Sequence, residues 1–261
     1  EGFGVANFAQ GGGTLDATYN WWGDPSGPSG VGLGSGDAVS ANVDYRPWLD
    51  APYQIGAARS FNVLNESTGA EFDTIQAAVD AADNGDTILV HPGTYEESVV
   101  VDVENLTLIG VGDPVLDASD CYSGFSIQAS GVTIDSFTVM NATSDGIRVY
   151  DENIEGGSVT IRNNVIGNNP EGILFDGNIS NSTITIENNL IQSCYAWETY
   201  YGEGIDFYNW VDNIWNSRIV IENNRIINNS DTYAVDLDAE IYSSEIVIVG
   251  NTIDSNGYDG I

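Results

Sequence analysis

Five short apolar runs repeat along the sequence at nearly regular intervals, and this repetition constrains the fold more than any other feature. Successive runs start 27, 25, 35 and 27 residues apart, at Val132, Val159, Ile184, Ile219 and Ile246. Apolar and polar residues alternate within the runs, as they do in a β-strand. The period and the alternation predict a solenoid of stacked β coils, because one coil cannot bury its own apolar face. The longer interval indicates an insertion of about eight to ten residues in one coil.

A second strand follows in each repeat, and its alternation predicts which side chains enter the solenoid. Neighbouring residues of a strand face opposite sides. We expect the apolar set to point inward, namely Ile147, Val149, Ile173, Phe175, Ile205, Phe207, Val235 and Leu237. The set expected to point outward is Arg148, Tyr150, Leu174, Asp176, Asp206, Tyr208, Asp236 and Asp238.

An asparagine recurs at one fixed offset of the repeat, at Asn164, Asn189, Asn224 and Asn251. A buried asparagine needs partners for its amide, and the asparagine one coil away supplies them, which predicts a hydrogen-bonded ladder. The alternative is that the Asn-Asn pairs only provide left-handed turn conformations. The fixed offset favours the ladder.

The charge balance limits the kinds of partner. The chain has 39 acidic residues against six arginines, with no lysine, and its formal net charge is −33. This charge repels nucleic acid and anionic membrane surfaces. Concentrated salt would screen it, since the Debye length falls to about 3 Å at 1 M. We therefore expect a halophilic source, with a calcium-loaded protein and a mutually repelling surface as alternatives. The sequence also contains no apolar run of membrane-spanning length.

Residues 72–85 predict a short amphipathic helix, capped by Asp73 or Thr74 and ended by Gly85. Such a helix would cover the open end of the coil stack and hide strand edges that otherwise pair with other chains. Its apolar face consists of Ile75, Ala78, Val79 and Ala82.

Three motifs around this helix have a specific order and spacing. They are Phe72-Asp-Thr-Ile-Gln-Ala-Ala-Val-Asp-Ala-Ala82, Gly85-Asp-Thr-Ile-Leu-Val-His-Pro-Gly-Thr-Tyr-Glu-Glu97 and Asn105-Leu-Thr-Leu-Ile-Gly110. They resemble the opening of the pectin-lyase-like superfamily, which includes pectinesterases and many archaeal surface proteins. The resemblance covers residues 59–261 and implies a right-handed parallel β-helix, while saying little about chemistry.

We expect three segments along the chain. Residues 1–58, rich in glycine and tryptophan, resemble the tail that closes β-helices in archaeal surface proteins. Residues 59–117 form the β-helix start with its capping helix, and residues 118–261 form the repeated coils. Because a closing segment precedes an opening one, we expect β-helix units arranged end to end, along one polypeptide or between subunits.

The outward acids of the second strands form the candidate metal site. Stacked coils bring these carboxylates close together, and oxygen-rich sites suit calcium. Paired carboxylates also cleave glycosides, which supports an enzymatic alternative. The pectinesterase-like fragments around Asp206 and Arg46 are incomplete, so we assign no catalytic residue. The candidate ligands are Asp176, Asp206, Asp236 and Asp238.

Aromatic residues on the outward column and in the long insertion predict a contact surface. Exposed rings stack on sugars, and Tyr and Trp are also enriched in subunit contacts. We favour a subunit contact over a carbohydrate site. The residues are Tyr150, Tyr208, Trp197, Tyr200 and Tyr201.

Several Asn-x-Ser/Thr sequences point to a location outside the cell. Those in predicted connections between strands are the better candidates for glycosylation, at Asn178, Asn181 and Asn228; Asn65 and Asn141 also fit the pattern.

Together these features predict a non-catalytic extracellular structural protein, one β-helix unit of a surface layer, adhesin or filament that assembles with itself. The first alternative is a polysaccharide-active lyase, esterase or glycoside hydrolase. The second is a carbohydrate-binding adhesin.

Overall fold

The computed structural model describes residues 4–8, 13–18, 20–49, 58–59, 62–150, 155–195, 202–208, 213–229, 233–257 and 260–261. The chain divides into two compact units, Glu1–Phe61 and Asn62–Ile261. The second unit holds nearly all of the segments 59–117 and 118–261.

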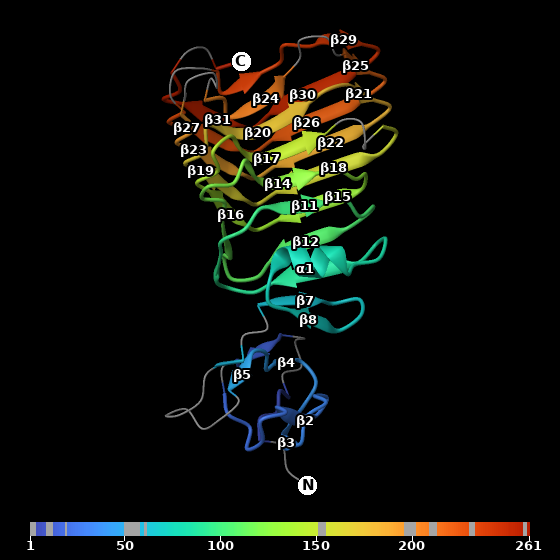
Figure 1. Cartoon of the computed structure of the whole chain (residues 1–261), viewed down its shortest axis with the longest axis vertical. Coiled ribbons are helices and arrows are strands. Elements are labelled where there is room, and N and C mark those ends of the chain that lie inside the picture. The colour runs from blue at the N-terminus through green and yellow to red at the C-terminus, as the bar shows by residue number, and fades with distance from the viewer. Residues whose placement is uncertain are drawn as a thin grey trace. The chain divides into compact units, whose positions relative to one another are not determined.

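Unit Asn62–Ile261 is a parallel β-helix in which each turn of the chain contributes one strand to each of three long sheets (Figure 1). Sheet 1 contains β9 (Thr87–Val90), β12 (Thr107–Gly110), β15 (Val132–Asp135), β18 (Ser158–Arg162), β22 (Thr183–Glu187), β26 (Arg218–Glu222) and β30 (Glu245–Val249). Sheet 2 contains β10 (Thr94–Tyr95), β13 (Val115–Asp117), β16 (Thr138–Met140), β19 (Val165–Gly167), β23 (Leu190–Gln192), β27 (Arg225–Ile227) and β31 (Thr252–Asp254).

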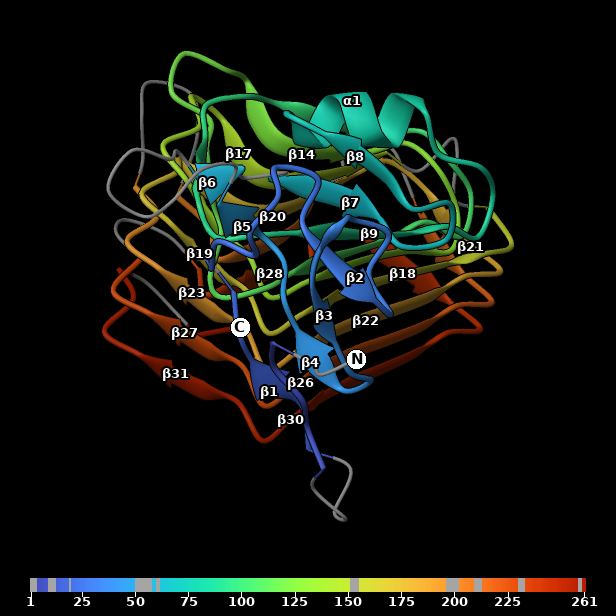
Figure 2. The same cartoon turned by 90° about the horizontal axis from the view of Figure 1, so that it is seen from below.

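Sheet 3 completes each coil, and later coils add a short fourth sheet. Sheet 3 contains β11 (Val99–Val101), β14 (Ser123–Ile127), β17 (Asp145–Tyr150), β20 (Glu171–Asp176), β24 (Ile205–Tyr208) and β28 (Val235–Asp236). Sheet 4 contains β21 (Ile179–Ser180), β25 (Asn213–Trp215) and β29 (Glu240–Tyr242). Figure 2, which looks along the stack, shows β19, β23, β27 and β31 following one another along one side.

The strand register confirms the repeat that the sequence predicts. Val132 pairs with Val159, Val159 with Ile184, Ile184 with Ile219, and Ile219 with Ile246. The second strands pair in the same way, with Ile147, Ile173, Ile205 and Val235 in one column. The expected inward residues line the core, although Leu237, near the last coil, is only partly buried.

The predicted asparagine ladder is present. Asn164, Asn189 and Asn224 each donate from Nδ2 to Oδ1 of the next asparagine, at 3.1, 3.0 and 3.0 Å, ending on Asn251. The same Oδ1 atoms accept the backbone N–H of the preceding asparagine at 2.8 to 2.9 Å. The alternative reading also holds, but for the other member of each pair: Asn163, Asn188 and Asn223 have φ near +58°.

A second ladder lies at the other end of the sheet 2 strands, and the sequence reasoning missed it. Asn229 donates from Nδ2 to Asn256 Oδ1 at 2.9 Å. Cys194 occupies the same column and donates its backbone N–H to Asn229 Oδ1 at 3.0 Å. One coil earlier, Asn169 Oδ1 accepts the N–H of Ala142 at 2.9 Å.

The predicted capping helix is α1 (Ile75–Asp80), with Thr74 as its N-cap and its apolar side buried. It is shorter than expected, because the helix already ends at Ala81, and Gly85 instead occupies a left-handed turn at φ +85°. Glu97 accepts the N–H groups of Ile75 and Gln76 at 2.8 and 3.0 Å, which satisfies two free donors of the helix. The Gln76 side chain accepts the N–H of Val100 at 2.6 Å and donates to its carbonyl at 3.2 Å, so it covers the edge of β11.

The first sheet is also closed at this end. β7 (Val63–Asn65) pairs antiparallel with both β9 and β8 (Ala70–Phe72). Tyr95, from the second opening motif, stabilises this closure, since its Oη donates to the carbonyls of Asn62 and His91 at 2.6 and 2.8 Å.

Unit Glu1–Phe61 has a small core of its own, formed by Ala17, Trp22, Val39, Val43 and Trp48. Its described strands are short: β1 (Leu15–Asp16) pairs parallel with β4 (Val43–Asp44), β2 (Pro28–Gly30) parallel with β3 (Gly36–Val39), and β5 (Trp48–Leu49) antiparallel with β6 (Ala58–Arg59). Gly27 has φ +83°, and a Cβ there would lie 2.5 Å from Trp48 Cε2. The glycine-rich stretch therefore allows the tryptophan to pack against backbone.

Candidate functional site

A cluster of acidic side chains lies where the chain bends from sheet 2 into sheet 3. Glu171 is the first residue of β20. In the next coil, Glu203 lies just before β24 and Asp206 lies within β24. Gly172 makes the bend: a Cβ on it would lie 2.7 Å from Ile191 Cγ2 and 3.3 Å from Cys194 Sγ, so this residue faces the interior. The acid before the glycine consequently faces outward, beside Asp206.

The three carboxylates meet in a confined space. One oxygen from each of Glu171, Glu203 and Asp206 lies within 4.8 Å of the other two. The residues are only 6%, 4% and 5% exposed. Glu171 Oε2 and Glu203 Oε2 are buried and have no hydrogen-bond partner among the described residues.

Burial and mutual repulsion shift the acids far from their ordinary titration range. Burial, together with the charges of Asp145 and Asp206, raises the pKa of Glu171 to about 9. Burial and the neighbouring Glu203 raise the pKa of Asp206 to about 8. Burial also raises the pKa of Glu203 to about 7, with a contribution from Asp236. At neutral pH the cluster therefore retains protons unless a cation replaces them.

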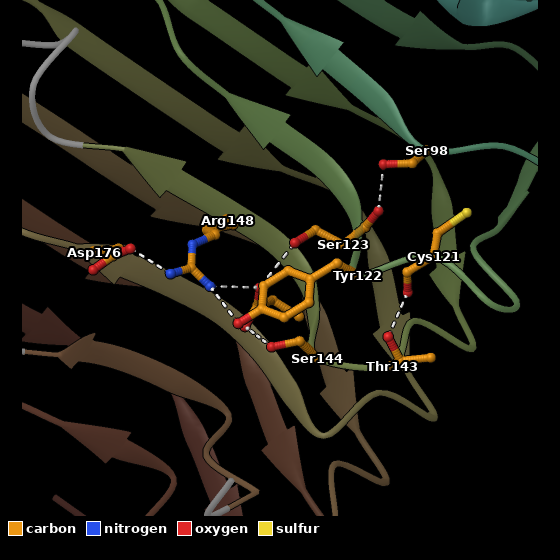
Figure 3. A network of polar contacts seen from close by, with 9 residues as sticks. Ser98, Cys121, Tyr122, Ser123, Thr143, Ser144, Arg148 and Asp176 are labelled. Carbon is orange, nitrogen blue, oxygen red and sulfur yellow. Dashed lines mark hydrogen bonds and ion pairs between the residues drawn. The ribbon is translucent and has the colours of Figure 1, made fainter. Parts of the chain in front are cut away.

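Arg148 lies beside the cluster and is already paired. Its Nη1 lies 3.3 Å from Asp145 Oδ2, and its Nη2 bonds Asp176. Figure 3 shows the guanidinium between Asp176 and the ring of Tyr122, whose hydroxyl it contacts at 3.2 Å. Asp145 also accepts from Ser123 Oγ and Ser144 Oγ, each at 2.9 Å. The arginine thus shares its single positive charge between two acids beside the cluster, one on β17 and one on β20.

The four acids expected as metal ligands occupy different surroundings. Asp206 is inside the cluster, and Asp236 pairs with it in register on the next coil. Asp176 is held by Arg148, and Asp238 is exposed. The sequence reasoning missed Asp145, Glu171 and Glu203. A signal was present, because an acid precedes the glycine of three successive second strands, at Asp145-Gly146, Glu171-Gly172 and Glu203-Gly204.

The predicted aromatic contact surface is described only in part. Tyr150 is half-buried, with Arg148 Cζ 5.1 Å from its ring centroid. The backbone of Tyr208 pairs with Asp176, and its side chain lies outside the described residues, as do Trp197, Tyr200 and Tyr201 entirely.

A different exposed aromatic pair lies on sheet 4. Trp215 and Tyr242 are 51% and 48% exposed, with their rings edge to face and centroids 6.1 Å apart. They line a surface hollow of about 380 Å³ together with Asn213, Asn216, Glu240 and Ser243. Such a hollow combines stacking surfaces with polar groups.

The candidate glycosylation sites differ in accessibility. Asn178, Asn181 and Asn228 are exposed. Asn141 is half-buried, and its Nδ2 donates to Asp117 Oδ1 at 3.0 Å. Asn65 is 1% exposed, and its Nδ2 donates to Asp86 Oδ2 at 2.7 Å, so the folded protein does not offer this amide to an enzyme.

The stacked sheets and the polar groups on their outer face define the class of protein, a parallel β-helix. Residues 123–261 match the family model described as "Right handed beta helix region", and the chain belongs to this family. The expected right-handed parallel β-helix is thereby confirmed. In the described part of the chain, no helix has the length and hydrophobicity needed to cross a membrane.

Two individual proteins are similar to this chain. A stretch of 116 residues is 34% identical to the cell surface glycoprotein of Methanothermus fervidus, covering 43% of this chain and 18% of that protein. The chain thus spans less than a fifth of its relative's length. A pectin methylesterase from Aspergillus niger is similar over 74% of this chain and 87% of its own, at 18% identity and a TM-score of 0.32, which is too low to bear on activity.

Proposed function

We propose that this chain is a structural β-helix segment of an archaeal cell-surface protein. The observation that carries the proposal is its 34% identity to a cell surface glycoprotein over 116 residues. The solenoid supports it, because a continuous core and two side-chain ladders give a rigid module suited to mechanical roles. The exposed positions of Asn178, Asn181 and Asn228 support glycosylation of the same surface.

Burial of the acidic cluster favours a structural role over a polysaccharide-active enzyme. A polymer must reach the catalytic carboxylates, whereas Glu171, Glu203 and Asp206 are at most 6% exposed. Incubation of the chain with acidic and neutral polysaccharides tests this choice. The structural proposal would be refuted if the chain released reducing or unsaturated sugar ends and the Asp206→Asn variant did not.

Surface location is tested on intact native cells. Treatment with a membrane-impermeant carboxylate-labelling reagent, followed by mass spectrometry, is expected to label peptides of this chain at exposed acids such as Glu66. Peptides that contain Asn178, Asn181 or Asn228 are expected to carry glycan masses. Labelling only after cell lysis would contradict the proposal.

The C-terminal end of the stack suits end-to-end assembly. β30 and β31 are the last strands of sheets 1 and 2, and the inward Ile248 and Ile253 are only partly buried, unlike their counterparts in earlier coils. Val249 and Ile241 at this end are 51% and 45% exposed. Among the described residues, no strand pairs with the outer edges of β30 and β31, and such edges with apolar side chains favour pairing with a further β-helix coil, of the same polypeptide or of another.

Light scattering after size exclusion tests this assembly. The chain is expected to self-associate as its concentration rises, and Val249→Lys is expected to reduce association because edge lysines oppose strand pairing. Val31→Lys, an equally exposed position in the other unit, is the control. A chain that stays monomeric at all concentrations, in low and high salt, would contradict assembly through this end.

A halophilic origin is a further part of the proposal, supported by the net charge of −33. If it is correct, the urea midpoint rises with NaCl well beyond the concentration at which simple screening saturates. A midpoint that is flat above physiological salt would argue against it.

The hollow at Trp215 and Tyr242 favours a second function, carbohydrate binding. Aromatic faces stack on the apolar faces of sugar rings, while Glu240 and Asn213 offer hydrogen bonds to hydroxyl groups. Titration with surface-derived glycans is expected to quench tryptophan fluorescence, and Trp215→Ala to abolish the change. Equal quenching in the variant would exclude this site.

A further inference from the structure

Three carboxylates from two consecutive coils meet at the point where the longest connection of the repeat leaves the stack. This connection joins β23 to β24, between Gln192 and Ile205. Glu171 belongs to the coil before it, and Glu203 and Asp206 belong to the coil after it. The backbone holds the two coils in contact here, because Gly172 N–H donates to the Glu203 carbonyl at 2.9 Å.

The cluster leaves buried oxygen atoms without partners. Glu171 Oε2 and Glu203 Oε2 receive no hydrogen bond from any described residue, although both residues are more than nine-tenths buried. A buried carboxylate oxygen without a donor is costly, and native proteins supply each such atom with a donor or a cation. Two of these atoms in one space indicate that a ligand is missing from the protein's own contacts.

The charges around these oxygens favour a cation as their partner. Arg148 is the basic residue of the sheet 3 strands, and Asp145 and Asp176 already bind its guanidinium. No described basic side chain forms an ion pair with Glu171, Glu203 or Asp206. Asp236 adds a further carboxylate one coil away, in register with Asp206. When its acids are ionised, the site therefore carries negative charge that no described basic side chain compensates.

Its geometry and chemistry suit calcium. All three donors are carboxylate oxygens, which are hard ligands. Two oxygens bound to one Ca²⁺ at about 2.4 Å are separated by at most about 4.8 Å. One oxygen from each of the three residues lies within that limit of the other two.

We propose that Glu171, Glu203 and Asp206 bind one Ca²⁺ ion that ties the coil of β20 to the coil of β24. The ion gives the unpartnered oxygens a ligand bond and offsets two of the three negative charges of the acids. It also ties the two coils together next to Cys194, the residue that interrupts the second ladder. Of the four outward acids that the sequence predicts as ligands, only Asp206 belongs to this site. The other three are Asp176, Asp236 and Asp238.

Calorimetric titration of CaCl₂ into the chelator-treated full chain tests the site, in about 1 M NaCl so that diffuse attraction to the acidic surface is screened. We expect saturable binding of one ion per chain and a rise in Tm. Glu171→Gln and Glu203→Gln each remove one charged ligand and are expected to weaken binding about tenfold or more. These substitutions keep the side-chain size and relieve repulsion, so the variants retain the fold, which circular dichroism checks.

Asp238→Asn is the matched control, since it removes one exposed charge from the neighbouring coil but no ligand. It is expected to change the affinity by less than about twofold. Absence of saturable heat and of a Tm change in the parent chain would overturn the proposal. An equal loss in Asp238→Asn would also overturn it, because binding would then be diffuse. Tighter binding of Mg²⁺ than of Ca²⁺ would overturn the assignment to calcium.

Discussion

The asparagine ladder makes a quantitative prediction about stability. Asn189 lies in the middle of the ladder and makes four side-chain hydrogen bonds. Its Oδ1 accepts from Asn164 N at 2.9 Å and from Asn164 Nδ2 at 3.1 Å. Its Nδ2 donates to the Ile161 carbonyl at 2.9 Å and to Asn224 Oδ1 at 3.0 Å. Substitution of Asn189 by alanine removes all four.

The consequences for the partners set the magnitude. The buried N–H of Asn164 loses its acceptor, and an orphaned buried donor costs about 1–3 kcal/mol. Asn164 Nδ2 keeps its bond to the Ile134 carbonyl at 3.0 Å, and Asn224 Oδ1 keeps the N–H of residue 189. The loss of the remaining bonds adds about 1 kcal/mol each at most. We expect Asn189→Ala to lower the free energy of unfolding by about 3–4 kcal/mol.

The adjacent asparagine provides a matched control. Asn188 is exposed, has φ +57°, and contributes only its left-handed backbone, which glycine adopts without strain. Asn188→Gly is therefore expected to change the free energy of unfolding by less than about 1 kcal/mol.

Urea unfolding at constant NaCl, followed by circular dichroism, measures both variants. With a urea m-value of about 2–3 kcal/mol/M, Asn189→Ala is expected to lower the midpoint by about 1–2 M. The Asn188→Gly midpoint stays near that of the parent chain. Equal midpoints for the two variants would refute the idea that the second asparagine of each pair stabilises the stack through its amide.

Three further predictions concern the cap, the acids and the interrupted ladder. Glu97→Ala removes the acceptor of two N-terminal N–H groups of α1 and is expected to cost about 1–2 kcal/mol in the urea titration, whereas exposed Glu96→Ala is silent. In chelator-treated protein, the pKa of Glu171 is raised to about 9, so the folded state keeps a proton that the unfolded chain releases near pH 4.3. The free energy of unfolding is therefore expected to fall as pH rises from about 5 to about 9. Glu171→Gln flattens this pH profile, and an unchanged slope would contradict the assignment. Cys194→Asn continues the second ladder and is expected to raise stability by about 1 kcal/mol relative to Cys194→Ala in urea; equal midpoints would count against it.

The coils were predictable because their signal is repeated and local. Val159, Ile184 and Ile219 recur at nearly constant spacing with strand alternation, so their register follows from the sequence once stacking is accepted. The Asn189 column has the same amide in four coils. The second ladder was missed because Ala142 and Cys194 interrupt its asparagines, and a column with mixed residue types is not visible as a repeat.

The acidic site was not predictable from alternation, because alternation fails at the bend. Counting back from Ile173 places Glu171 on the inward side. The structure turns Gly172 inward instead, against Ile191, and so the acid before it faces outward. Sequence reasoning identified Asp206 but not its partners. The depth of burial, which determines the raised pKa values, depends on how neighbouring coils and connections pack around the site.

The ladder spans coils of different length without a change in its geometry. Asn189 and Asn224 are separated by 35 residues and Asn224 and Asn251 by 27, yet both Nδ2 to Oδ1 distances are 3.0 Å. The additional residues therefore leave the ladder hydrogen bonds unchanged and lie in the connections between the ladder positions. A foreign peptide grafted between positions 195 and 202 would leave the ladder positions and the proposed calcium ligands in place, and natural variation there would alter what neighbouring cells or molecules encounter while the supporting solenoid stays the same.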